Sequence, residues 1–211
     1  MKKKKLITVV LWLVCAFAFI LGFTIKNGST KANAQAMVAS AEIATNANVA
    51  NHGKAFDVDY DVSLRIVDAD GEQPGYEAIV RLDGKTLQVL EGRTEYRPDE
   101  MEKFGNVIQT DVNFDGQPDL LICLGGMNVT DQTFIYYDAW LSRKVSGNHT
   151  FSLYKDFRDI TNAEVDATKK RILSHYMARD GSFTYSAQQW VNGKLELDGK
   201  SWNVKKKLVI R

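Results

Sequence analysis

The residues from Asp111 to Asp119 carry the clearest chemistry in the sequence, and they read Asp-Val-Asn-Phe-Asp-Gly-Gln-Pro-Asp. Oxygen-bearing side chains stand at the first, third, fifth and ninth positions of this stretch: Asp111, Asn113, Asp115 and Asp119. Alternate residues of a tight loop point inward, and three carboxylates this close repel one another unless a cation lies between them. A hard divalent cation takes about six to eight oxygen ligands. The spacing therefore predicts a Ca²⁺ loop of the EF-hand type.

Two further positions extend this pattern, and two features depart from it. Gly116 stands at the sixth position, where the chain must turn sharply, and Gln117 at the seventh offers its backbone carbonyl. The twelfth position is Ile122, so the glutamate that closes a helical EF-hand is missing. The flanks Val107–Thr110 and Leu120–Leu124 have strand character, so we expect a strand–loop–strand version, as in the calcium loops of integrin-type FG-GAP blades.

The alternative interpretation is an acidic hairpin turn that needs no metal. Asx-turn hydrogen bonds hold such turns, and single Asp-Gly pairs such as Asp83-Gly84 are of this kind. Four ligands at the right spacing together with the glycine are much harder to obtain by chance, which favours Ca²⁺. We expect a structural ion that pins the turn, because no base or nucleophile cluster accompanies it.

Other chemical signals are weak, and we expect no enzymatic activity. The three histidines, His52, His149 and His175, show none of the short His or Cys/His spacings that are typical of zinc sites. No G-x-S-x-G motif supports a nucleophilic serine. Only scattered acidic residues would support an esterase or glycosidase activity.

The charge of the chain divides into a basic leader and an acidic body. The sum is +1, from 27 Lys and Arg against 26 Asp and Glu, but residues 1–36 hold six lysines and no acid. The remainder has 21 basic and 26 acidic residues, a net charge of −5. A phosphate-tracking surface needs clustered Lys and Arg, so the body is not expected to bind nucleic acid.

The leader predicts export across the cytoplasmic membrane. Lys2–Lys5 precede the uncharged stretch Leu6–Phe23, and Ala34-Gln35-Ala36 offers a cleavage site. The same stretch is just long enough to span a bilayer. Residues 1–36 are therefore a signal peptide or an N-terminal membrane anchor, and 37–56 form a tether. Both alternatives place the body in the periplasm or at the cell surface, secreted or membrane-anchored, with membrane contact only through an uncleaved N-terminal helix.

Residues 57–211 are predicted to form one all-β domain. Val58–Ile66 alternates apolar and polar residues, which is typical of a half-buried strand. Asp-Gly and Asn-Gly pairs, which suit tight hairpin turns, separate the apolar runs that follow. We expect antiparallel hairpins in a propeller-like or sandwich arrangement after the N-terminal hydrophobic helix, and Thr161–Lys170 is the best candidate for a short helical turn.

The segment Tyr176–Tyr185 is the preferred candidate for a protein-binding surface. It combines aromatic side chains and an arginine with a flexible Asp180-Gly181 tip, and aromatic residues are favoured anchors at interfaces. The candidate contact residues are Tyr176, Arg179, Phe183 and Tyr185. The alternative is an ordinary hairpin.

The order of segments resembles a known family. The calcium loop DVNFDGQPDLLI is followed by Gly125-Gly126 and then by the segments TFIYYDAWL (133–141), FSLYKDFRDITNAEVDATKKRIL (151–173) and FTYSAQQWVNGKLEL (183–197), with RLDGKTLQVLEG (81–92) upstream. The chain resembles the exported bacterial proteins related to a Xanthomonas immunity protein that neutralises a peptidoglycan-degrading type IV secretion effector. The likeness covers Val58–Leu197.

The resemblance implies binding rather than catalysis. A family member carries a calcium loop on a propeller-like body and inhibits a lysozyme-like enzyme by inserting a loop with an aromatic side chain into its cleft. The resemblance therefore implies an immunity or inhibitor protein whose partner is a cell-wall hydrolase, with Tyr176 or Tyr185 as candidates for the inserted residue. The alternative is a cell-envelope adhesion or structural module that uses an FG-GAP-like calcium loop for rigidity.

Overall fold

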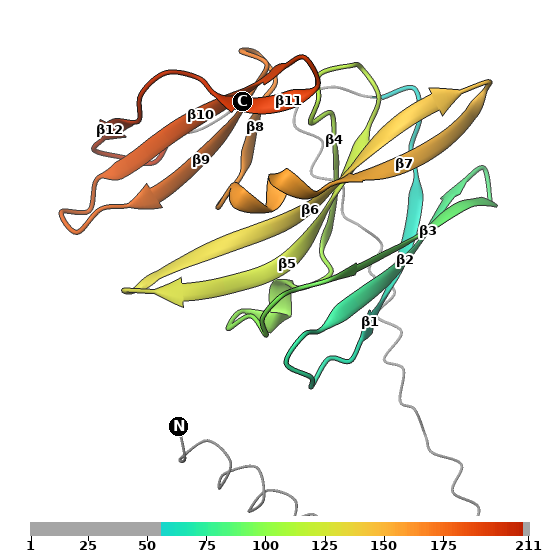
Figure 1. Cartoon of the computed structure of the whole chain (residues 1–211), viewed down its shortest axis with the longest axis horizontal. Coiled ribbons are helices and arrows are strands. Elements are labelled where there is room, and N and C mark those ends of the chain that lie inside the picture. Colours follow the sequence, from blue (N-terminus) through green and yellow to red (C-terminus); the bar gives the residue numbers. More distant parts are fainter. Residues whose placement is uncertain (1–55, 209–211) are drawn as a thin grey trace, which may run out of the picture. The chain divides into compact units, whose positions relative to one another are not determined.

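A computed structural model of the chain describes residues 56–208 (Figure 1). The predicted signal peptide or anchor, and all of the predicted tether except Phe56, lie outside the described residues. Within the described part of the chain, no helix combines the length and the apolar character needed to span a membrane.

Three antiparallel sheets follow one another along the chain. The first sheet has the order β1-β2-β3, the second β4-β5-β6-β7, and the third β11-β10-β9-β8, with β12 also paired to β10. The strands of the first sheet are β1 (Asp61–Val67), β2 (Gly75–Leu82) and β3 (Lys85–Arg93). Those of the second are β4 (Val107–Thr110), β5 (Asp119–Val129), β6 (Gln132–Val145) and β7 (Asn148–Tyr154). Those of the third are β8 (Glu164–Asp166), β9 (Arg171–Met177), β10 (Phe183–Val191), β11 (Lys194–Leu197) and β12 (Trp202–Val204).

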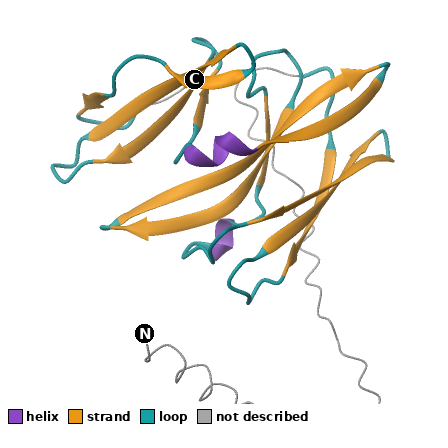
Figure 2. Cartoon of the chain, viewed as in Figure 1, coloured by secondary structure: helices purple, strands orange, loops and turns teal. Residues whose placement is uncertain are grey.

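The described residues confirm an all-β, antiparallel fold. Figure 2 shows strands throughout, with two short 3₁₀ helices, η1 (Met101–Lys103) and η2 (Lys155–Asp159), and no α-helix among residues 56–208. The predicted helical turn in Thr161–Lys170 is wrong, because β8 lies within it and pairs with β9. The choice between propeller and sandwich stays a prediction.

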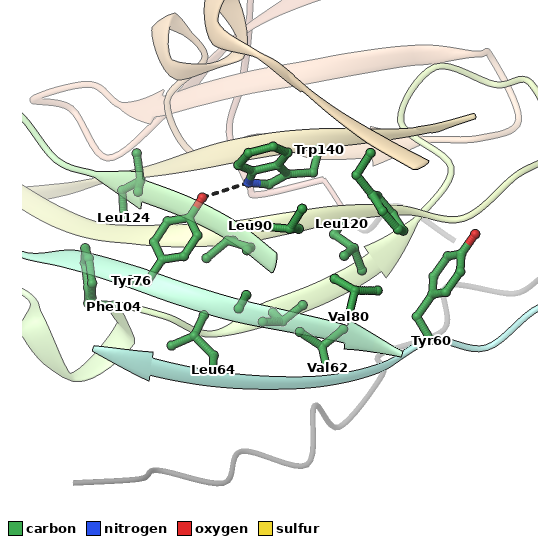
Figure 3. Close-up of a cluster of buried hydrophobic side chains, with 14 residues drawn as sticks. Tyr60, Val62, Leu64, Tyr76, Val80, Leu90, Phe104, Leu120, Leu124 and Trp140 are labelled. Carbon is green, nitrogen blue, oxygen red and sulfur yellow. Dashed lines mark hydrogen bonds between the residues drawn. The ribbon is translucent and has the colours of Figure 1, made fainter. Parts of the chain in front are cut away.

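The second sheet is buried on both of its faces. Leu120 points into a core shared with the first sheet, where it lies with Val80 and Leu90 (Figure 3). Ile122 belongs to the same core. Leu121, between them, points into a second core that includes Ile172 of the third sheet. Successive residues of a strand face opposite sides, so burial on both faces requires the continuous apolar run that begins β5.

Side-chain amides join edges where no strand pairing is formed. Gln88 of β3 donates to the carbonyl of Phe151 in β7 at 3.1 Å and accepts from its N–H at 2.8 Å. Gln109 of β4 holds Tyr60 in the same way, at 2.6 and 3.1 Å. Each glutamine imitates one rung of a β-ladder, so it satisfies buried backbone groups that would otherwise lack partners.

Asn162 connects the second sheet to the third. Its N–H donates to the carbonyl of Ile135 in β6 at 2.8 Å, and its Oδ1 accepts from the N–H of Ile135 at 2.9 Å. Its Nδ2 donates to the carbonyl of His175 in β9 at 3.0 Å. One residue thus bridges the outer edges of two strands that do not pair with each other.

Candidate functional site

The predicted calcium loop connects β4 to β5. These strands pair antiparallel, and the last pair, Thr110 with Asp119, closes the base of the loop. The structure therefore confirms the strand–loop–strand arrangement. Gly116 has a φ of +90°, in the region that favours glycine, so the sharp turn falls at the predicted sixth position.

Three of the predicted ligands are gathered by shared hydrogen bonds. The N–H of Asp115 donates to Asp111 Oδ1 at 3.0 Å and to Asn113 Oδ1 at 3.1 Å, which brings these two oxygens to one side of the loop. The N–H of Gly116 donates to Asp111 Oδ2 at 2.9 Å. Asn113 Nδ2 donates to Asp115 Oδ2 at 3.0 Å. Asp111, Asn113 and Asp115 thus form one cluster of oxygens.

The bond from Asp115 N–H to Asn113 is an Asx-turn, and so is the bond from Gln117 N–H to Asp115 Oδ1 at 2.8 Å. The alternative interpretation therefore also finds support here. The two interpretations are compatible, because such bonds hold the side-chain oxygens in place whether or not an ion is bound. For Gln117 only the backbone is relevant, and its carbonyl remains the predicted ligand.

Asp119 lies deeper than the other four predicted ligands. It has no exposed surface, and both of its oxygens accept backbone N–H bonds. Oδ2 accepts from Val112 at 2.9 Å and from Asn113 at 3.3 Å, and Oδ1 accepts from Ser142 of β6 at 2.7 Å. A carboxylate offers about four acceptor positions, so three are taken within the protein. Asp119 therefore connects the loop to β6 through the hydrogen bond from Ser142.

Burial dominates the electrostatics of the loop. Desolvation raises the pKa of Asp119 to about 7, although the three N–H bonds act in the opposite direction. Desolvation also raises the pKa of Asp111, and the carboxylate of Asp115 adds to the increase. Both shifts mean that the loop holds negative charge at a cost in free energy, which a bound cation would reduce.

The donor set fits a hard cation in its chemistry. Asp111, Asn113 and Asp115 supply side-chain oxygens of the kind Ca²⁺ prefers. Within residues 56–208, no group of three or more His, Cys, Asp or Glu side chains is gathered as a ready metal site. The loop differs from such a group because one of its donors is an amide and another is a backbone carbonyl. Calcium binding stays a prediction.

Sequence reasoning missed a buried network behind the loop. Tyr60 Oη lies 3.0 Å from Ser142 Oγ and 2.8 Å from His149 Nδ1. Because Ser142 also donates its N–H to Asp119, the network connects the loop to the segment that precedes β1. Tyr60 is 82 residues from Ser142 and 89 residues from His149 in the sequence, and no spacing rule relates it to them.

The hairpin β9–β10 carries the predicted partner residues, and the structure places three of the four at or near the surface. Tyr176 is 46% exposed, Arg179 is exposed and Phe183 is half-buried. The prediction for Tyr185 is wrong, because its side chain is fully buried, stacks on His175, and accepts the N–H of Leu208 with its hydroxyl at 3.0 Å. Met177, which the sequence did not single out, is 40% exposed beside Tyr176.

A second buried carboxylate lies on β6. Asp138 has no exposed surface, and its oxygens accept from Arg158 Nε at 2.5 Å, from Arg158 Nη2 at 3.0 Å and from Tyr76 Oη at 2.6 Å. Trp140 Nε1 donates to the same tyrosine oxygen at 2.7 Å, the bond drawn in Figure 3. A charged residue inside the apolar run of β6 was the available signal for this site.

Comparisons with known proteins identify no relative. No family model matches the chain, and neither a curated protein nor a solved structure matches it significantly. The resemblance to the exported immunity proteins therefore stays an expectation from the order of sequence segments.

Proposed function

We propose that the chain is an extracytoplasmic calcium-binding β domain that binds a protein partner, acting as an immunity or inhibitor protein against a peptidoglycan hydrolase. The carrying observation is that one N–H, that of Asp115, bonds to oxygens of both Asp111 and Asn113 and so gathers the predicted ligands. The basic, apolar leader supports export. Three successive sheets, with the middle one buried on both faces, support a propeller-like arrangement over a two-sheet sandwich.

The proposed partner surface is the tip of β9–β10, with Tyr176, Met177 and Arg179 exposed. The hairpin is attached to the second sheet as well as to its own. The N–H of Met177 donates to Gln132 Oε1 at 2.8 Å. A surface fixed in this way loses little conformational entropy when it binds, which favours its use as an anchor.

Calcium binding is tested by titrating the full chain with Ca²⁺ in a calorimeter, with and without Asp115→Ala. Wild type should bind one ion, and the variant should not bind at the same concentrations. Asp83→Ala, in the Asp-Gly turn between β2 and β3, is the matched control and should bind as wild type does. Equal heats from wild type and Asp115→Ala would show that the loop is not a calcium site.

Hydrolase inhibition is tested by turbidity clearance of a peptidoglycan suspension by lysozyme-type hydrolases, in the presence of the full chain. Protection by wild type should weaken roughly 30-fold in Tyr176→Ala, the loss expected for a binding hot spot of about 2 kcal/mol. Val145→Ala, at the exposed tip of β6–β7, should protect as well as wild type. Failure of every hydrolase to be inhibited or to form a complex would contradict the inhibitor function.

The alternative, an envelope adhesion or structural module, is favoured by the bond between Asp119 and β6, which makes the loop part of the core. In that case calcium should raise the melting temperature while every hydrolase remains active. The turbidity assay and the melting measurement with calcium together therefore separate the two functions.

A further inference from the structure

A cavity of about 460 Å³ lies beside the second sheet, away from the calcium loop. One wall is the segment Thr94–Pro98, which follows β3, and the other is formed by Leu124, Met127 and Tyr136 of β5 and β6. Arg158 and Asp159 of η2 complete the lining. Its volume lies in the range of small-molecule sites, about 300–1,000 Å³.

The wall formed by Thr94–Pro98 is held in position before any ligand arrives. Thr94 Oγ1 bonds to the carbonyl of Tyr96, and the N–H of Glu100 donates to the carbonyl of Gly126 at 3.0 Å. A Cβ on Gly125 would lie 2.6 Å from Pro98, so this glycine is what allows the segment to approach β5. The irregularity of the β5–β6 pairing between Cys123 and Gly126 thus lies where β5 seats one wall of the cavity.

Arg158 presents unused donors at the cavity. A guanidinium has five N–H groups, and Asp138 engages Nε and one hydrogen of Nη2. Among the described residues, no acceptor is bonded to Nη1. Because Asp138 holds the guanidinium at two points, the remaining donors are fixed in direction and suit an uncharged acceptor such as an amide carbonyl.

The charged groups around the cavity exclude an anion and leave hydrogen-bond donors to be satisfied. Asp138 neutralises Arg158, while Glu95 and Asp159 add two carboxylates to the lining, so an anion would be repelled. A simple cation offers no acceptor to the free N–H donors of Arg158, so it would leave them unsatisfied. A ligand that both donates and accepts hydrogen bonds without net charge satisfies all of these groups.

Two apolar features of the cavity further restrict the kind of ligand that it can bind. Tyr96 is 69% exposed at the cavity, so one face of its ring is free to cover the apolar side of a ligand. Leu124 and Met127 add apolar atoms to the lining, against which an apolar group of a ligand can pack.

From this combination we propose that the cavity binds a neutral N-acetylated amino sugar. The ring C–H face stacks on Tyr96, the acetamido carbonyl accepts from Arg158, its N–H donates to Glu95 or Asp159, and its methyl group packs against Leu124 and Met127. This site is independent of the calcium loop and of the hairpin proposed to bind a hydrolase.

The test is calorimetric titration of the full chain with the trimer of N-acetylglucosamine. The cellulose trimer is the matched ligand control, because it carries a hydroxyl in place of each acetamido group. We expect at least a tenfold preference for the acetylated trimer. N-Acetyl-leucine amide supplies an apolar group beside an amide without a sugar ring, and it should bind at least tenfold more weakly than the acetylated trimer.

Variants locate the binding at the cavity. Tyr96→Ala should weaken binding about tenfold, Tyr96→Phe should retain it, and Val129→Trp, at an exposed position of the lining, should block it by filling space. Tyr176→Ala should bind the sugar normally, although it is expected to lose hydrolase inhibition. The side chains of Tyr96 and Val129 are both exposed, so their replacement should not disturb the core. Unchanged melting temperatures of the variants would verify folding.

Four results would overturn the assignment. Equal affinity for the two trimers would mean that the acetamido group contributes nothing to binding. Stronger binding of the leucine amide would make the cavity a docking site for a protein segment instead. No binding by wild type, or binding that neither Tyr96→Ala nor Val129→Trp affects, would leave the cavity without this ligand.

Discussion

Asp119 and Asp138 are both fully buried on the second sheet, and they are satisfied in opposite ways. Asp138 is paired with a guanidinium and also accepts from the hydroxyl of Tyr76. Asp119 accepts three backbone N–H groups, and within residues 56–208 no Lys, Arg or His side chain forms an ion pair with it. Asp138 therefore has a permanent counter-charge, whereas Asp119 is stabilised only by the dipoles of backbone N–H groups.

The difference is the reason to propose a cation at one site and not at the other. Asp138 is a completed ion pair, and adding a metal there would compete with Arg158. Asp119 closes a loop in which Asp111 and Asp115 add further negative charge, so a divalent ion would supply what the protein lacks. Buried charge is stable only when it is paired, and here the pairing partner is proposed to come from solution.

The largest effect should come from breaking the completed pair. Arg158→Met leaves Asp138 buried without its counter-charge and should lower the free energy of unfolding by about 3–5 kcal/mol. Urea denaturation at pH 7 measures the change. Adding Asp138→Asn to this variant should recover part of the loss, and a double variant as unstable as Arg158→Met would contradict the explanation.

The next effect is a dependence on pH in the presence of a chelator. The folded pKa of Asp119 is about 7 and its ordinary value is 3.8, so the folded state binds more protons between these values. The free energy of unfolding should therefore fall as the pH rises from about 4 to about 7, by at most about 4 kcal/mol. Denaturant melts across this range measure it. Asp119→Asn should flatten the profile, and a wild-type profile that rises instead would refute the assignment.

Calcium should act on one carboxylate and leave the other unaffected. At a free concentration of 100 times its Kd, Ca²⁺ should raise the free energy of unfolding by about 2.7 kcal/mol. Arg158→Met should gain the same increment, because the loop and the ion pair share no bonding partner. Thermal melts of both proteins with calcium and with chelator give the two increments. A variant that gains nothing would mean that the sites are coupled.

The smallest expected effect concerns the network behind the loop. Tyr60→Phe removes the hydroxyl that bonds to Ser142 and His149 and should cost about 1 kcal/mol. Tyr76→Phe is the matched change on the other carboxylate and should cost about 1.5–3 kcal/mol, because its hydroxyl bonds to a charged group. Equal costs, measured by denaturation, would contradict the contrast between the two sites.

Local patterns predicted much of the fold and the strand–loop–strand shape of the candidate site. β1 (Asp61–Val67) overlaps the alternating segment Val58–Ile66, the flank Val107–Thr110 is a strand, and the sharp turn falls at Gly116. Alternation does not say which face of a strand is buried, so Tyr185 was assigned to the surface although it lies in the core. The pair Asp138–Arg158 depends on how η2 packs against β6, which no local pattern encodes.

Asn162 has a consequence for the behaviour of the protein in concentrated solution. The outer edge of β6 beyond its pairing with β7, and that of β9 beyond β8, would each offer unpaired backbone groups to a neighbouring chain. By occupying Ile135 on one edge and His175 on the other, Asn162 removes two points at which intermolecular strand addition could begin. A single asparagine thus occupies backbone groups at the edges of two strands that do not pair with each other.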